Sequence, residues 1–144
     1  MNNWEEIAIE LLNKSLGLIP QELNELDWKS DLSDKSNRLA QHISAFANYP
    51  GGGYLAFGIN NQGETLILDQ EQTEKIIHRL GNIARNNLAQ PVGIEHAILT
   101  FRDVPILLIY IPESHEKPVH LRGTDVFESY KRSAGHTVKM TRHE

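Results

Sequence analysis

The stretch AFANYPGGGYLAFGI, residues 45–59, decides the fold because it joins the end of an apolar helix to the start of a buried strand. Upstream of it, apolar residues recur at the spacing of one helix face, which predicts a helix over about 33–48 with a buried face formed by Leu39, Ala40, Ile43, Phe46 and Ala47. Gly51 to Gly53 end this helix through positive-φ conformations and allow a tight entry into a strand over 53–59. A phosphate-binding glycine loop needs the opposite order, strand then loop then helix. The stretch therefore argues against an NTPase or a dinucleotide enzyme.

Two further segments have helical periodicity. The first begins at Asn3, where a capping box starts a helix whose buried face we expect to hold Trp4, Ile7 and Leu11. The second begins near Asp69 or Thr73 and ends before Pro91, with a buried face of Ile76, Leu80, Ile83 and Ala84.

The strand signals lie between and after these helices. Residues 25–29 alternate, so Leu26 and Trp28 should face one way and Glu25, Asp27 and Lys29 the other. The turn NNQG, residues 60–63, predicts a hairpin into TLIL, residues 65–68. Strands over 94–101 and 104–111 should be joined by a turn at 102–103, and a last strand is expected around 126–131. We predict an α+β fold with a mostly antiparallel or mixed sheet backed by about three helices.

The composition is that of one globular domain. The chain has 144 residues, of which 40% are hydrophobic and 23% charged, and it contains no cysteine. The lack of cysteine excludes a disulfide scaffold, a thiolate metal site and a cysteine nucleophile, and it suits a reducing compartment. The longest apolar run is too short to cross a bilayer and the first residues are acidic, so we expect a cytoplasmic protein without membrane partners.

The net charge of −5 hides an uneven distribution along the chain. Residues 1–34 hold eight acidic side chains and two lysines, a net charge of −6, whereas residues 117–144 hold six basic and three acidic side chains, a net charge of +3. Such polarity is typical of two different functional surfaces, although ordinary solvated faces also produce it.

A carboxylate and lysine cluster lies around the first strand. Asp27 and Lys29 share a face about 7 Å apart along the strand, and Glu22 lies just upstream. Two carboxylates can hold Mg²⁺ or Mn²⁺ and a lysine can support developing charge, which is the minimum for metal-dependent phosphodiester cleavage. The alternative is a solvated strand edge whose Asp–Lys pair contributes little.

Two other groups of residues raise site hypotheses. The seven histidines are scattered, and His115 and His120 have no metal-ligand spacing, so we expect no dedicated histidine metal site. The tail FESYKRSAGHTVKM, residues 127–140, interleaves basic side chains with Tyr130, which suits phosphates with one stacking face. A solvated strand end explains the tail equally well.

Several of these pieces together resemble the Schlafen AlbA-like domain. They are ELNELDWK (22–29), ISAFANYPGGGYLAFGINNQGE (43–64), PVHL (118–121) and YKRSAGHT (130–137). Bacteria carry this domain at the front of transcriptional regulators often labelled as RecG-related ATP-dependent helicases. The resemblance implies a nucleic-acid-binding module followed by further domains, so that any ATP would be bound outside this chain.

The resemblance also implies a competing activity. Animal Schlafen relatives cleave transfer and ribosomal RNA with carboxylates near the first strand and after the glycine-rich strand. Glu22, Asp27 and Lys29 match the first part of that pattern, but Asn60 and Asn61 stand where the nucleases have aspartate. A second departure is RSAGHT, in which Ala134 stands where the family usually has glycine.

We expect residues 1–144 to form a single domain, of the kind that precedes further domains in a longer protein, with no catalysis and no cofactor of its own. The residues expected to bind DNA or RNA are Lys35, Arg38, Lys131, Arg132, His136 and Lys139. The first alternative is a Mg²⁺- or Mn²⁺-dependent ribonuclease built on Glu22, Asp27 and Lys29, and the second is a regulatory protein-interaction domain. Because related animal proteins pair two such lobes in one chain, a homodimer is also expected.

Overall fold

The computed structural model describes residues 3–17, 20, 23–31, 35–124 and 128–141. Its helices are α1 (Asn3–Ser15), α2 (Ser36–Ala47) and α3 (Gln70–Asn86). Its strands are β1 (Leu26–Lys29), β2 (Gly53–Phe57), β3 (Glu95–Phe101), β4 (Val104–Ile111), β5 (Tyr130–Ser133) and β6 (His136–Lys139). No helix within these ranges is long and apolar enough to cross a membrane.

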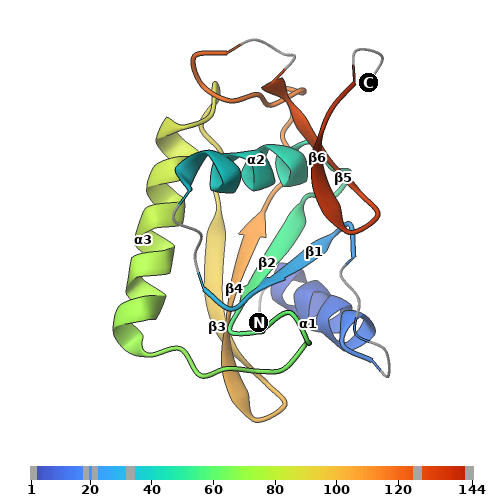
Figure 1. Cartoon of the computed structure of the whole chain (residues 1–144), viewed down its shortest axis with the longest axis vertical. Helices are drawn as coiled ribbons and strands as arrows, with labels where there is room; N and C mark the ends of the chain where they lie inside the picture. The colour runs from blue at the N-terminus through green and yellow to red at the C-terminus, as the bar shows by residue number, and fades with distance from the viewer. Residues whose placement is uncertain (1–2, 18–19, 21–22, 32–34, 125–127, 142–144) are drawn as a thin grey trace.

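A four-stranded mixed sheet in the order β1-β2-β4-β3 forms the centre of the molecule (Figure 1). β1 and β2 are parallel, whereas β4 is antiparallel to both β2 and β3. The sequence of β4 is apolar on both faces, which predicts a strand covered on both sides, and β4 is an inner strand of the sheet. β5 and β6 form a separate antiparallel hairpin that packs on α2. The predicted α+β class with about three helices is confirmed.

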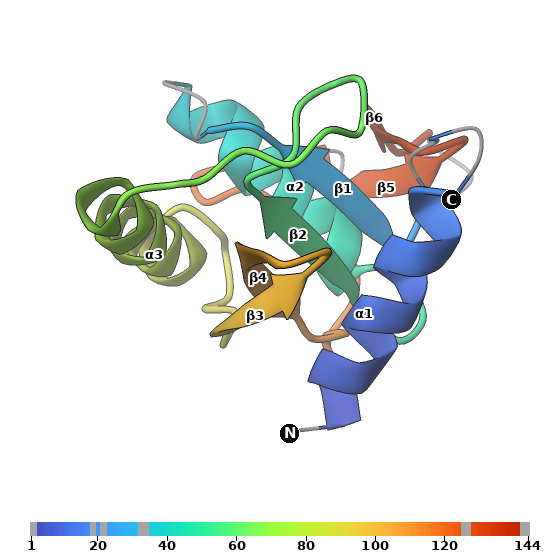
Figure 2. The ribbon, with the colours of Figure 1, turned by 90° about the horizontal axis from the view of Figure 1, so that it is seen from below.

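One face of the sheet is covered by α1 (Figure 2). The helix buries Trp4, Ala8 and Leu12 in one apolar cluster with Leu26 and Trp28 of β1. Within this cluster the Trp4 ring stacks on Tyr54 of β2 and Tyr110 of β4. The expected stripe of Trp4, Ile7 and Leu11 is confirmed at Trp4 and in part at Leu11, which is half-buried and packs against this cluster. It is wrong at Ile7, which is 40% exposed.

The opposite face is covered by α2 and α3, whose predicted buried stripes are both confirmed. α3 begins with a capping box in which the Asp69 side chain accepts a hydrogen bond from the Gln72 backbone N–H. α2 buries Leu39, Ile43 and Phe46 fully.

The glycine segment makes a close passage between α2 and β2. Gly51 and Gly52 have φ angles of +84° and +75°, as expected for residues that leave a helix. A Cβ on Gly52 would collide with the backbone carbonyl of Ile111, and one on Gly53 would collide with the Phe46 ring. Gly53 has no positive φ, so it is required for close packing rather than for the turn.

Two strand predictions are corrected by the structure. Residues 65–68 form no strand, and the expected hairpin after NNQG is reduced to a single bridge between Ile59 and Thr65. The last strand begins at Tyr130 rather than near 126 and continues through a turn into β6. Residues 126 and 127 of the predicted strand lie outside the described part of the chain.

Candidate functional site

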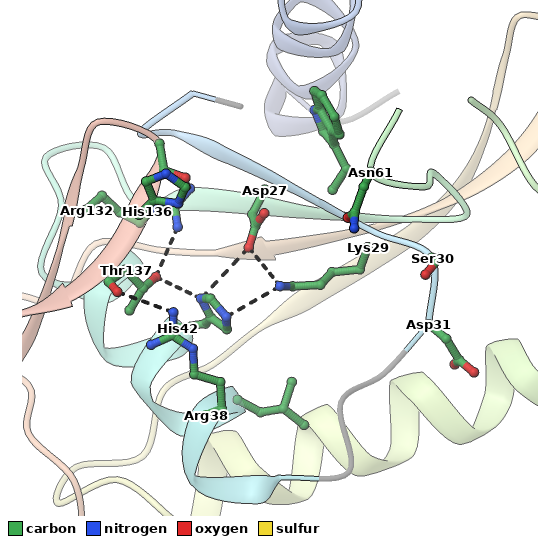
Figure 3. Close-up of a pocket in the computed structure, with 13 residues that line it drawn as sticks. Asp27, Lys29, Ser30, Asp31, Arg38, His42, Asn61, Arg132, His136 and Thr137 are labelled. Carbon is green, nitrogen blue, oxygen red and sulfur yellow. Dashed lines mark hydrogen bonds and ion pairs between the residues drawn. The ribbon is translucent and has the colours of Figure 1, made fainter. Parts of the chain in front are cut away.

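A cleft of about 320 Å³ opens where β1, the first turns of α2 and the β5–β6 hairpin meet (Figure 3). Its polar lining comes from four segments of the sequence: Asp27, Lys29, Ser30, Asp31, Arg38, His42, Asn61, Arg132, His136 and Thr137. The acidic front and the basic tail of the chain, which the sequence presents as separate regions, therefore meet in one site.

Asp27 and Lys29 face this cleft because β1 alternates. Leu26 and Trp28 point towards α1, and the side chains between and after them point towards α2. Lys29 Nζ lies 3.1 Å from Asp27 Oδ2. Asp27 is only 4% exposed, so the alternative of a solvated edge is wrong. The ion pair fixes the lysine at the cleft wall, where its side chain keeps 26% of its surface exposed.

His42 connects β1 to the hairpin. Its Nδ1 lies 2.7 Å from Thr137 Oγ1 and its Nε2 lies 3.5 Å from Lys29 Nζ. An ammonium group can only donate, so Nε2 accepts and Nδ1 carries the hydrogen that is donated to Thr137. The imidazole is therefore a neutral link between the cation of β1 and the hydroxyl of β6.

The surroundings of His42 keep it neutral. Burial lowers its pKa from 6.5 to about 3, and the positive charges of Lys29, Arg38 and Arg132 act in the same direction, while the nearby Asp27 carboxylate opposes them. At neutral pH the cleft thus has three cationic side chains, those of Lys29, Arg38 and Arg132, against the carboxylates of Asp27 and Asp31.

Arg132 is the most deeply placed of the cations, with 5% of its surface exposed. Its guanidinium donates to the backbone carbonyls of Leu23, Asn24 and Gly135 and to Thr137 Oγ1, at distances between 2.9 and 3.2 Å. It also lies 4.6 Å from the centre of the Phe46 ring. Arg132 therefore connects the hairpin to α2 and to the segment before β1. Its guanidinium also lines the cleft and adds positive charge to it.

Arg38 and His136 are exposed at the mouth of the cleft. Arg38 donates to Gln41 Oε1 at 2.9 Å within its own helix and to the Thr137 carbonyl at 3.3 Å. His136 lies at the turn between β5 and β6 (Figure 3).

The remaining predicted residues lie outside the cleft lining or outside the described chain. Lys35 is exposed and precedes the first residue of α2, and Lys131 is half-buried on β5. Lys139 pairs with Glu128 at 2.7 Å. Glu22 is one of the residues that the structure does not describe, so its relation to Asp27 stays a prediction.

Among the described residues, the cleft does not present a grouped set of ligands for a divalent metal. Asp27 Oδ2 is bound by Lys29, and Asn61 faces the cleft with a neutral amide (Figure 3). Asn60 instead accepts hydrogen bonds from the backbone N–H groups of Gln62 and Glu64 and so shapes the turn after β2. Within the described ranges, no three His, Cys, Asp or Glu side chains are grouped to hold a metal.

Residues 22–141 match the family model described as Schlafen, AlbA_2. The chain belongs to this family. None of the curated proteins compared with this Schlafen AlbA_2 domain matches it.

Several solved structures share the fold, among them two that are similar to this chain over most of its length. One is the N-terminal domain of a RecG-related, helicase-like protein from Nitrosomonas europaea, with a TM-score of 0.61, 23% identity, and coverage of 95% of this chain and 96% of that domain. The other is a Corynebacterium diphtheriae protein with a TM-score of 0.56 and 16% identity over 96% of this chain. The Schlafen AlbA_2 domain spans only 27% of the Corynebacterium protein.

His42, Ser30 and Asp31 line the cleft but are not among the residues that the sequence singles out. His42 is one of seven scattered histidines, but it stands four residues after Arg38 and therefore on the same side of a helix. This spacing predicts that Arg38 and His42 lie together on one polar strip of the helix, beside its apolar face. Its contact with Thr137 is tertiary and has no counterpart in the sequence.

Proposed function

We propose that this Schlafen AlbA_2 domain binds nucleic acid through the phosphate backbone at the cleft, without catalysis of its own. The observation that carries the proposal is the convergence of Lys29, Arg38, Arg132 and His136 on one concave surface. Cationic side chains in a groove neutralise phosphates and release counterions, and this supplies affinity without reading the base sequence.

The cleft residues divide into two roles. Arg38, Lys29 and His136 keep exposed surface at the mouth and are the proposed phosphate contacts. Asp27 and Arg132 are buried and act as positioning residues, since the first holds Lys29 and the second holds the hairpin. Lys35 lies one helical turn before Arg38, and Lys131 and Lys139 extend the basic surface along the hairpin; we propose them as secondary contacts.

The relatives give independent support. The Nitrosomonas europaea domain stands at the N-terminus of a protein named for a DNA helicase. A module in that position can hold DNA while another part of the protein uses ATP. We propose the same arrangement for the protein that contains this domain, in a helicase-like or transcription-regulating role.

The proposal is tested by the binding of fluorescent duplex DNA of mixed sequence, and of RNA of the same sequence, at several salt concentrations. Arg38→Ala should weaken binding roughly five- to tenfold and lower the slope of log K against log salt by about one. The matched control is Arg85→Ala, because Arg85 is also an exposed helical arginine that donates to an amide three residues away, here Asn82 Oδ1 at 3.0 Å. Equal effects of the two variants, or no binding at low salt, would contradict the proposal.

The ribonuclease alternative has one observation in its favour, which is that Asp27 faces the cleft in which a phosphate would lie. It requires cleavage of structured RNA when Mn²⁺ is added, and loss of that cleavage in Asp27→Asn. RNA that stays intact over hours under conditions where it is bound would leave the binding module as the function of this cleft.

A further inference from the structure

β3 is an open edge of the main sheet. It is seven residues long and pairs with β4 on one side only, and within the described ranges no strand pairs with its other side. An open edge presents unpaired backbone N–H and C=O groups that can accept a further strand.

The turn between β3 and β4 fixes which groups point outwards. Arg102 and Asp103 have φ angles of +52° and +63°, which is typical of a two-residue type I′ turn. Phe101 and Val104 are then a hydrogen-bonded pair, and the alternation along an antiparallel ladder directs the backbone groups of His96, Ile98 and Thr100 to the open side. These three side chains are all exposed, and Ile98 is 58% exposed.

The other edge of the sheet is protected, and β3 is not. β1 is only four residues long and carries Asp27 and Lys29, and short charged edges resist the addition of strands. β3 contains no lysine, no proline and no bulge, and its register with β4 is continuous over all seven residues. β3 therefore has none of the lysine, proline or bulge features that prevent edge pairing, and its one charged carboxylate, Glu95, lies at the end of the strand.

We propose that β3 pairs with β3 of a second copy of this chain in an antiparallel, two-fold symmetric dimer with one continuous sheet. In the register centred on Ile98, every outward-pointing residue faces another: Ile98 faces Ile98, and His96 faces Thr100 on both sides of the axis. Shifting the centre to Ala97 or Leu99 would place one of these residues opposite a position outside the strand. The centred register is thus the one that satisfies all six outward backbone groups of each copy.

The side chains at this seam favour a second copy as the occupant. Ile98 would meet its own counterpart at about 5 Å between Cβ atoms, and that distance allows direct apolar contact. It also lines an apolar groove of about 410 Å³ under α3, together with Leu68, Ile77, Pro105 and Leu107, so the seam would lie beside further apolar surface. Glu95 is the carboxylate of β3, and antiparallel pairing places the two Glu95 side chains at opposite ends of the seam. Pairing in this register therefore brings apolar side chains together and keeps the two carboxylates apart.

The seam is separate from the cleft. β3 and β1 are opposite edges of the sheet, so pairing through β3 leaves the cleft of each copy open. Dimerisation and nucleic-acid binding can then be tested independently of each other.

The decisive experiment is sedimentation equilibrium of the chain without nucleic acid. The average mass should rise from 16.3 kDa towards twice that value over roughly 10 to 500 μM, because small edge interfaces are weak. Ile98→Lys should raise the dimer dissociation constant at least tenfold, since two like charges would face each other on the axis. Ile67→Lys is the control, because Ile67 is another exposed isoleucine, 76% exposed, that lies outside the strand.

A chain that stays monomeric throughout this range would overturn the proposal, and so would an Ile98→Lys variant that dimerises as well as the parent. An equal loss in Ile67→Lys would also overturn it, because it would indicate unspecific hydrophobic association. If Ile98→Lys does not fold by circular dichroism, amide exchange of the unmodified chain replaces it. Exchange at His96, Ile98 and Thr100 should slow as protein concentration rises, and unchanged rates would contradict the dimer.

Discussion

The buried histidine of the cleft makes the stability of the domain depend on pH in a specific way. His42 is 5% exposed and its pKa is lowered to about 3, whereas an unfolded chain has the ordinary value near 6.5. Between these two values the unfolded state binds a proton that the folded state does not bind. The contribution of His42 to stability is therefore complete above pH 6.5 and is lost as the pH falls towards 3.

The size of the effect follows from these two values. Acidification from pH 8 to pH 5 should lower the free energy of unfolding by about 2 kcal/mol through His42 alone. His42→Gln removes the titrating group and keeps a side chain that can accept from Lys29 or donate to Thr137.

The assay is urea unfolding of the parent and of His42→Gln at pH 5, 6, 7 and 8. The other histidines are common to both proteins, so the difference between the two pH profiles isolates His42. We expect the parent to lose about 2 kcal/mol more than the variant between pH 8 and pH 5. Parallel profiles, or a His42 imidazole that titrates near pH 6.5 in NMR spectra, would refute the buried neutral link between Lys29 and Thr137.

Three further substitutions test the structural framework, each by urea unfolding at neutral pH. Arg132→Lys should lower the free energy of unfolding by about 2–3 kcal/mol, because a lysine cannot donate to the carbonyls of Leu23, Asn24 and Gly135 together. A loss below about 0.5 kcal/mol would contradict the role of Arg132 in holding the hairpin in place. Gly52→Ala should destabilise the domain by at least about 2 kcal/mol more than Gly51→Ala. Both glycines have a positive φ, but only Gly52 is packed against a backbone carbonyl, that of Ile111. Equal losses of stability in the two variants would show that the segment is not closely packed at Gly52. Trp28→Phe should lower the free energy of unfolding by about 1 kcal/mol more than Trp4→Phe. The Trp28 indole donates a hydrogen bond to Ser15 Oγ at 2.7 Å, whereas Trp4 Nε1 has no partner among the described residues. A larger loss of stability in Trp4→Phe would show that this hydrogen bond is not stabilising.

The secondary structure was predictable where one periodicity dominated. The stripes of α2 and α3 read correctly because large apolar residues recur at helical spacing and polar residues fill the other face. In α1 the apolar spacing predicts only part of the buried face, because the small residue Ala8 is fully buried whereas the larger Ile7 is 40% exposed. The strand predicted over residues 65–68 is wrong because an apolar pattern does not by itself ensure pairing. Ile67 is exposed, and only isolated hydrogen bonds, such as that from the Leu66 N–H to the Gly58 carbonyl, hold the segment.

The site was predictable in its parts and not in its assembly. The alternation of β1 placed Asp27 and Lys29 on one face, and the basic tail contained Arg132 and His136, as the cleft shows. Their meeting depends on the packing of the β5–β6 hairpin on α2, which no local pattern encodes. The burial of Arg132 and the neutrality of His42 also arise only from that packing, because both depend on contacts between residues about 90 or more positions apart.

The central claim, that nucleic-acid phosphate binds in the cleft, is tested most directly by an NMR titration of the isotope-labelled domain with a short duplex of mixed sequence. The account predicts shifts of the backbone amides of Lys29, Arg38, His136 and Thr137, which reverse on addition of salt. Amides of α3 and β3, on the far side of the sheet from β1, should stay unchanged. Shifts confined to α3 or β3, or no shift at low salt, would contradict the account.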